Sequence, residues 1–307
     1  MTLSRTSMPF CMSATPFTAD NKLDEAGFRA HLRRMVGHGL GVYLASPGSG
    51  EGHALTDEEL SRVYTIGVEE CRGKVPTFAN LPESRTAAQM QRRLKIARDA
   101  GVDVIQVYGL DAGHGMHPNV TEQEHYYRTV LDGVDYPLSL SVHVFAGYVP
   151  PVALIKKMCD EYKSIVAVNV MGTSTTYLVE MMEAIGPRLA YYTSIRHLAE
   201  GLGLGTQGSL LGQANLVPRL CRAVYDRYNA GDLKGYNEAF SLFMRFNAVL
   251  ERWGSNPRWI KMGMKILDLP GSGGGRLREP YVLPSEADHQ ELAKAIDRLG
   301  IRQFEGL

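Results

Sequence analysis

The chain has no excess of charge of either sign. Lysine plus arginine and aspartate plus glutamate each number 33 among 307 residues, so the formal net charge is zero. Proteins that bind nucleic acids or anionic membranes carry basic surfaces, because they must neutralise phosphate charge. The composition gives no indication of such a surface, and we expect neither a nucleic-acid nor a membrane partner.

Cysteine and long apolar runs are also scarce. The four cysteines form no Cys-x-x-Cys pair, which favours reduced, mostly buried thiols. No apolar run approaches the ~18 residues of a membrane-spanning helix. Residues 1–7 lack the apolar stretch of a signal peptide. We therefore expect a cytoplasmic protein.

Short apolar runs alternate with longer amphipathic segments, as in repeated βα units. No Gly-x-Gly-x-x-Gly follows the first run, which argues against a doubly wound dinucleotide-binding sheet. Eight strands with intervening helices predict an α/β protein with a (β/α)8 TIM barrel. The expected strands are 9–13, 41–45, 75–79, 104–108, 138–143, 165–168, 189–193 and 205–209.

The expected helices between these strands are 24–38, 57–71, 85–100, 122–131, 151–162 and 177–185. Thr56 and Glu59 predict a capping box at the start of the second helix. The glycine run Gly201–Gly205 predicts a tight turn before the last strand. After residue 216 the strand pattern stops and only helical patterns follow. We therefore expect a barrel over residues 1–216 and a helical extension packed on it over residues 217–307.

Four motifs occur in order along almost the whole chain. They are Ala14–Phe17, Pro47–Glu51, Gly205–Asn215, and Arg258–Leu267 followed by Arg278–Pro280. Together they resemble the dihydrodipicolinate synthase / N-acetylneuraminate lyase family. The resemblance implies a TIM barrel, a small-molecule substrate, and a homotetramer built as a dimer of dimers.

The chain departs from that family where the family carries its chemistry. Asn169 stands where the resemblance places the lysine that forms a Schiff base with a keto acid. An amide nitrogen is conjugated to a carbonyl and is not nucleophilic. The family's tyrosine and arginine motifs on strand five align with Ser141–Val144 and Phe145–Tyr148, and its tyrosine pair after strand four aligns with Gly109–Ala112. The resemblance thus predicts the fold, and the departures predict a different reaction or none.

Active sites of TIM barrels lie at the C-terminal ends of the strands, which selects the candidate residues. His143 follows strand five, and an imidazole that titrates near neutral pH suits general acid–base catalysis. A histidine bonded into the barrel wall is the alternative. Asn169 could orient a carbonyl or stabilise an oxyanion, or simply fill the space of the lysine.

The loop after strand two is the second candidate region. Backbone N–H groups of Gly48 and Gly50 could bind a carboxylate, and the Ser49 hydroxyl adds a donor; an ordinary glycine turn is the alternative. Glu51 is a binding candidate that we expect to brace neighbouring loops. The remaining strand-end candidates for substrate binding are Tyr108, Arg196 and Ser209.

Arg196 could replace the missing arginine of the family, although a salt bridge at a helix start explains it as well. His114 and His117, in the loop 111–117 after strand four, could chelate a divalent metal or belong to a mobile lid. They lie in no recognised metal motif, and we expect neither a metal nor another cofactor.

These observations predict a lyase of the aldolase or hydro-lyase type. It would act on a small carbonyl or carboxylate compound without a lysine Schiff base, and it would not be a true dihydrodipicolinate synthase. The alternatives are a non-catalytic barrel that binds a small carboxylate, a metal-assisted lyase, and an ordinary pyruvate aldolase whose lysine lies elsewhere.

Overall fold

The computed structural model describes residues 6–254 and 256–307. Eight parallel strands form a closed barrel in sequence order, which confirms the predicted (β/α)8 TIM barrel. The strands are β1 (Met8–Met12), β2 (Gly41–Leu44), β3 (Thr77–Asn80), β4 (Val104–Tyr108), β5 (Leu138–His143), β6 (Ile165–Met171), β7 (Ala190–Ser194) and β8 (Gly208–Leu211).

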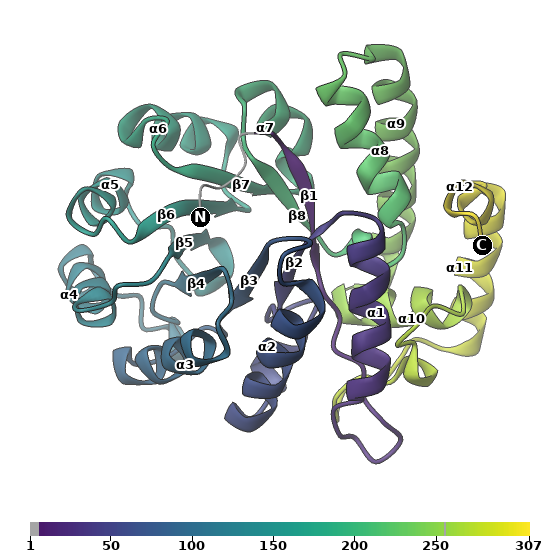
Figure 1. Ribbon diagram of the computed structural model, residues 1–307, viewed down its shortest axis with the longest axis horizontal. Coiled ribbons are helices and arrows are strands. Elements are labelled where there is room, and N and C mark those ends of the chain that lie inside the picture. Colours follow the sequence, from purple (N-terminus) through teal and green to yellow (C-terminus); the bar gives the residue numbers. More distant parts are fainter. Residues whose placement is uncertain (1–5, 255) are drawn as a thin grey trace. The chain divides into compact units, whose positions relative to one another are not determined.

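The chain divides into two compact units. One contains residues 6–7 and Phe78–Leu210, and the other contains Met8–Thr77 and Leu211–Leu307. In the first unit, the helices follow one another along the outer side of β4 to β7 (Figure 1). They are α3 (Ala87–Ala100), α4 (Val120–Leu131), α5 (Val152–Glu161), α6 (Thr175–Ile185) and α7 (Leu198–Leu204). A domain division at residue 216 stays a prediction.

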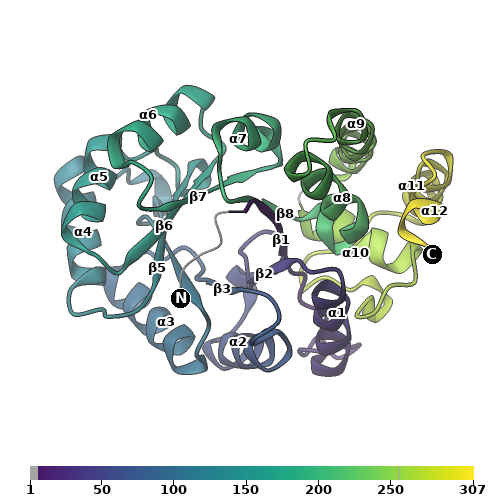
Figure 2. The same cartoon turned by 45° about the horizontal axis from the view of Figure 1, so that its top comes forward.

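The second unit contains the other helices. They are α1 (Glu25–Gly37), α2 (Asp57–Cys71), α8 (Pro218–Asn229), α9 (Leu233–Leu250), α10 (Asn256–Ile266), α11 (Glu286–Arg298) and α12 (Ile301–Glu305). Figure 2 shows α8 and α9 side by side, and α8 also packs on β1. The predicted capping box at α2 is confirmed, since Thr56 accepts from the Glu59 N–H and Glu59 accepts from the Thr56 N–H.

The turn predicted at Gly201–Gly205 is wrong, because these residues form the second half of α7 and its end. Gly201 lets the helix approach the sheet: a Cβ there would lie 2.9 Å from Thr206 Oγ1 and 3.1 Å from Thr193 Oγ1. Gly205 adopts φ +82° and ends the helix in the left-handed conformation that glycine tolerates best. The eighth strand therefore begins at Gly208, three residues later than predicted.

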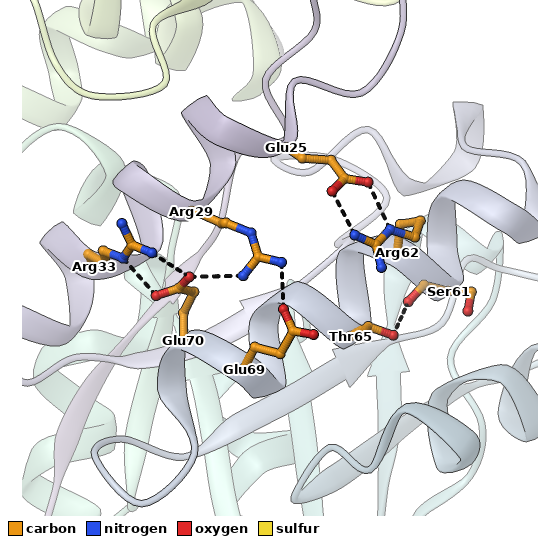
Figure 3. Close-up of polar contacts among 8 residues, drawn as sticks. All are labelled: Glu25, Arg29, Arg33, Ser61, Arg62, Thr65, Glu69 and Glu70. Atoms are coloured by element: carbon orange, nitrogen blue, oxygen red, sulfur yellow. Dashed lines mark hydrogen bonds and ion pairs between the residues drawn. The ribbon is translucent and has the colours of Figure 1, made fainter.

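Helices α1 and α2 are joined by ion pairs on their facing sides (Figure 3). Arg33 Nε lies 2.8 Å from Glu70 Oε2, and Arg29 Nη1 lies 3.0 Å from Glu70 Oε1. Arg62 and Glu25 form a separate bidentate pair nearer the start of both helices. The Glu70 carboxylate is buried, whereas the Glu25–Arg62 pair is exposed.

All four cysteines are buried, and none of them forms a disulfide bond. Within residues 6–254 and 256–307, no helix is both long and apolar enough to cross a membrane.

Candidate active site

A chain of three buried amides lies on the inner face of the first unit's strands. Asn169 Nδ2, on β6, donates to Gln106 Oε1 on β4 at 3.1 Å, and Gln106 Nε2 donates to Asn80 Oδ1 on β3 at 3.0 Å. All three side chains are at most 1% exposed. Asn169 therefore hydrogen-bonds across the intervening strand β5, toward the inside of the barrel strands. We call Asn80, Gln106 and Asn169 the amide chain.

Asn80 and Gln106 were not among the residues predicted for the site. Neither belongs to a motif: Gln106 lies inside the otherwise largely apolar strand β4, and Asn80 is the last residue of β3. That position was itself a signal, because a buried amide needs hydrogen-bond partners and finds them most readily in other buried polar groups. The pairing of Asn80 with Gln106 in the register of β3 and β4 brings these two amides together.

Tyr108 lies at the end of β4, two residues beyond Gln106 and on the same side of the strand. Burial raises the pKa of the Tyr108 hydroxyl, and the negative charge of Glu83 raises it further. Hydrogen-bonding contacts with Asn80, Ser141 and Gln106 partly offset that rise. At neutral pH the hydroxyl is therefore protonated and can donate a hydrogen bond.

His143 ends β5 and contacts Tyr108 edge to face, with ring centroids 5.7 Å apart. The backbone N–H of Phe145 donates to His143 Nδ1 at 3.2 Å, so this nitrogen is an acceptor and carries no proton. Burial lowers the pKa of His143 to about 4. At neutral pH the ring is thus uncharged, with its proton on Nε2, and it offers a donor rather than a base at that nitrogen.

Asn169 Oδ1 and Ser139 Oγ, near the amide chain, have no hydrogen-bond partner in the described part of the protein, and their side chains are 1% and 0% exposed. Ser141, which is paired with Asn169 in the register of β5 and β6, is also buried. The inner face of the first unit thus presents both donors and acceptors.

Ser209 lies apart from the amide chain. Ser209 Oγ hydrogen-bonds Thr193 Oγ1 at 2.9 Å, and Thr193 packs beside Gly201 of α7, so this pair faces the helix rather than the amide chain. Arg196 is exposed in the turn 195–197 after β7. Its backbone N–H donates to Ser194 Oγ at 3.3 Å.

The Gly48–Glu51 loop belongs to the second unit, and its groups are largely used inside the loop. The Gly50 N–H contacts Ser46 O at 3.0 Å and Ser46 Oγ at 3.1 Å. The Glu51 N–H points to Gly48 O at 3.4 Å. Ser49 is fully buried, and its hydroxyl accepts from Asn256 Nδ2 at 3.1 Å. The geometry thus favours a self-bonded turn over an open anion site.

Glu51 adopts φ +51° and is buried against the C-terminal helices. Its carboxylate forms an ion pair with Lys261 on α10 and accepts from the Arg278 backbone N–H at 2.9 Å. Lys261 Nζ lies 4.1 Å from the centre of the Phe17 ring. Burial lowers the pKa of Lys261 to about 8, against the opposing effect of Glu51. These contacts hold the loop to α10 and leave the Lys261 amine engaged.

His114 and His117 are exposed in the loop after β4 and line a groove of about 760 Å³ between α3 and α4. Asp111 in this loop pairs with Arg85 at 3.4 Å. In the part of the chain that the structure describes, no three His, Cys, Asp or Glu side chains come together in a set that could hold a metal ion.

Comparisons with known proteins agree with this architecture. The model of the dihydrodipicolinate synthetase family matches residues 6–299. An uncharacterized DapA-like lyase from Thermofilum pendens is 25% identical, over 94% of this chain and 95% of its own. A 4-hydroxy-tetrahydrodipicolinate synthase from Sorangium cellulosum is also 25% identical, over 96% of both chains.

Solved structures of low sequence identity share the fold. Dihydrodipicolinate synthase from Aquifex aeolicus superposes with a TM-score of 0.87 at 18% identity, over 96% of this chain and 98% of its own. A prophage protein of the same family from E. coli K12, solved with pyruvate, gives 0.85 at 20% identity, over 96% and 99%. The chain therefore belongs to the dihydrodipicolinate synthetase family.

Proposed function

We propose that this chain is a lyase that acts on a small carbonyl or carboxylate compound through hydrogen bonds, without an enzyme-bound imine. It is then not a true dihydrodipicolinate synthase. Membership of a family whose relatives are named lyases and synthases supports the reaction class. The observation that carries the proposal is Asn169, which occupies β6 as a buried amide bonded to Gln106.

The lysines of the first unit support the absence of an imine. Residues Phe78–Leu210 contain four lysines, and none lies in a strand. The ammonium groups of Lys95, Lys156 and Lys157 pair with acidic side chains, and that of Lys163 donates to a backbone carbonyl; all four lie on helices or their ends. No lysine of this unit is therefore placed to replace the amine missing at Asn169.

Without an imine, the carbonyl oxygen itself must carry the charge that develops when a neighbouring bond breaks. Hydrogen-bond donors that are already in place stabilise such an oxyanion. Tyr108 and the Nε2–H of His143 are suited to this role, and Asn169 is suited to orienting the substrate. We assign these three residues to the reaction. We assign Ser49, Gly48, Gly50 and Glu51 a structural role in holding the loop after β2.

Borohydride trapping tests the proposal. The pyruvate ketone and a lysine amine would condense with release of water to form an imine. Hydride from borohydride would then reduce the imine to a stable secondary amine, which mass spectrometry detects. We expect no adduct on the wild-type protein and an adduct on Asn169→Lys, which restores an amine at this position. A wild-type adduct on any lysine would refute the proposal and favour an ordinary pyruvate aldolase.

A screen for turnover separates this proposal from its alternatives. Release of new carbonyl products, unaffected by chelators, is the expected result. Loss of activity on chelation would support a metal-assisted lyase. Ligand-induced thermal stabilisation with no turnover of any ligand would support a non-catalytic binding protein.

A further inference from the structure

The buried polar surface of the first unit is uncharged. Between Phe78 and Leu210, a stretch that the structure describes throughout, no Asp, Glu, Lys or Arg is buried. The buried polar residues are Asn80, Ser84, Gln106, Gln123, Ser139, Ser141, Asn169, Thr193, Ser194, His197, Thr206 and Ser209. His143 adds an uncharged ring at the strand end.

A carboxylate substrate would need a cation or several free N–H groups here. Burying an anion without such partners costs several kcal/mol, because its hydration is lost. Among the described residues, Lys261 is the one Lys or Arg that is buried, and it is paired with Glu51. In the Gly48–Glu51 loop, the N–H groups of Gly50 and Glu51 already point to loop oxygens. The first unit therefore offers an anion no buried cation, and the buried lysine of the second unit is already paired.

Hydroxyl groups suit this surface better. An alcohol donates one hydrogen bond and accepts others, and amides and hydroxyls do both. Asn169 Oδ1 is buried and has no partner among residues 6–254 and 256–307, so it can accept from a substrate hydroxyl. Tyr108 and His143 Nε2 can donate to a carbonyl oxygen. The set thus matches a molecule with one carbonyl and neighbouring hydroxyls.

Aromatic rings complete the surface. Phe78 and Tyr192 contact each other edge to face with centroids 5.4 Å apart, and Tyr192 is paired with Asn169 in the register of β6 and β7. Ring faces pack against C–H groups, which line one side of a polyol, and they offer nothing to a carboxylate. The rings therefore favour the same class of ligand as the amides.

Resting on the proposed function, we infer that the substrate of this site is an uncharged polyhydroxylated carbonyl compound, such as a short ketose, rather than a keto acid. The inference rests on the amide chain, Ser139, Tyr108 and His143, which lie together on a surface without buried charge. The residue that most favours a carboxylate substrate instead is the exposed Arg196, because its guanidinium could bind a carboxylate.

A matched pair of ligands tests the inference. Dihydroxyacetone and hydroxypyruvate share a carbonyl and a hydroxymethyl group and differ only in that a second hydroxymethyl replaces the carboxylate. Calorimetry and thermal shift on the full chain, with erythrulose as a longer ketose and pyruvate as a second acid, give the four affinities. We expect both ketoses to bind at least about tenfold more tightly than either acid.

Three variants test whether the ketoses bind at the surface around Asn169. Asn169→Leu removes the free acceptor and should abolish ketose binding. Ser141→Ala, a smaller change that the fold should accept, should weaken it about fivefold, as expected for one neutral hydrogen bond. Arg196→Gln should leave ketose binding unchanged.

Tighter binding of hydroxypyruvate, especially if Arg196→Gln abolishes it, would overturn the inference, as would the absence of binding by both ketoses. The proposed function fails separately. An acid that is cleaved without a trapped imine would leave the proposed function intact while refuting the inference. A ketose that binds and is trapped on a lysine would refute the proposed function and leave the inference about the substrate class intact.

Discussion

At the scale of single residues, the structure changes the role of His143 from the one that the sequence suggested. A histidine at a strand end was expected to move protons near neutral pH. Its Nδ1 instead accepts from the Phe145 N–H, and burial removes the positive charge. A neutral imidazole with a fixed tautomer is a hydrogen-bond donor at Nε2, which suits the stabilisation of an oxyanion.

We predict that His143 titrates near pH 4 rather than near its ordinary value of 6.5. Because the unfolded chain takes up this proton first as the pH falls, His143 should lower the free energy of unfolding progressively from pH 6.5 toward pH 4 and have no such effect above pH 6.5. Nitrogen-15 NMR of the imidazole reports both the pKa and the protonated nitrogen.

The control is His143→Gln, which assigns the signals and should remove this part of the pH dependence of stability. Buried His31, whose pKa is also lowered to about 4, remains in both proteins as an internal reference. Titration of His143 near pH 6.5, or a proton on Nδ1, would contradict the assigned role.

The same scale shows what sequence reasoning could and could not reach. Asn169 was found because a resemblance named its position. Gln106 was missed because a polar residue inside a strand has no motif, and its meaning depends on which other strands face it. Asn80 was missed although it ends β3, because a lone asparagine at a strand end does not show that other buried amides lie beside it. The His143 tautomer depends on one backbone N–H two residues away, whose direction no sequence pattern specifies.

At the scale of elements, strands β4 and β5 have the predicted bounds. Strand β4 is a largely apolar run that ends before Gly109, and in β5 leucine and valine alternate with serine. The sequence does not predict helix α7, because the glycines Gly201, Gly203 and Gly205 favour a turn. Glycine disfavours a helix by about 1 kcal/mol, a cost that tertiary packing can override. Here the absence of a side chain at Gly201 is what allows the packing.

The contact between α1 and α2 provides a test at this scale (Figure 3). We predict that Glu70→Gln lowers the free energy of unfolding by about 1–3 kcal/mol, because two arginines lose a buried partner. Glu25→Gln should cost at most about 0.5 kcal/mol, because its pair with Arg62 is exposed. The Glu70 side chain is 9% exposed and that of Glu25 is 41% exposed. Urea denaturation measures both.

Salt separates the two pairs further. Raising the salt concentration to about 1 M should remove the effect of Glu25→Gln and leave much of the effect of Glu70→Gln, because screening acts mainly on exposed charges. Equal costs for the two substitutions at low salt would show that burial does not govern this contact.

At the scale of the whole molecule, the family resemblance implies a homotetramer, and the surface carries apolar side chains that an assembly could cover. Met116 and Phe145 are 79% and 80% exposed. They lie on two loops of the first unit that are joined by the hydrogen bond from Ala112 N–H to Ala146 O, at 3.2 Å. Where exposed apolar groups form a contiguous patch, the surface is typically one that binds other proteins.

We predict that light scattering after gel filtration gives about four times the chain mass of 33.9 kDa. The double variant Met116→Ser/Phe145→Ser should lower the measured mass if these loops form one of the contacts, and Val282→Ser, another exposed apolar position at 74%, serves as its control. A mass of one chain for the wild type would refute the prediction.

The four buried cysteines leave the surface free of competing thiols for chemical labelling. A maleimide reacts with the thiolate, and burial raises the pKa of Cys11, Cys159 and Cys221 while also blocking access to the sulfur. Cys71 is fully buried as well. A single cysteine introduced at an exposed position such as His114 should therefore take up a fluorophore selectively, so that movements of the loop 111–117 can be followed optically in the otherwise native protein.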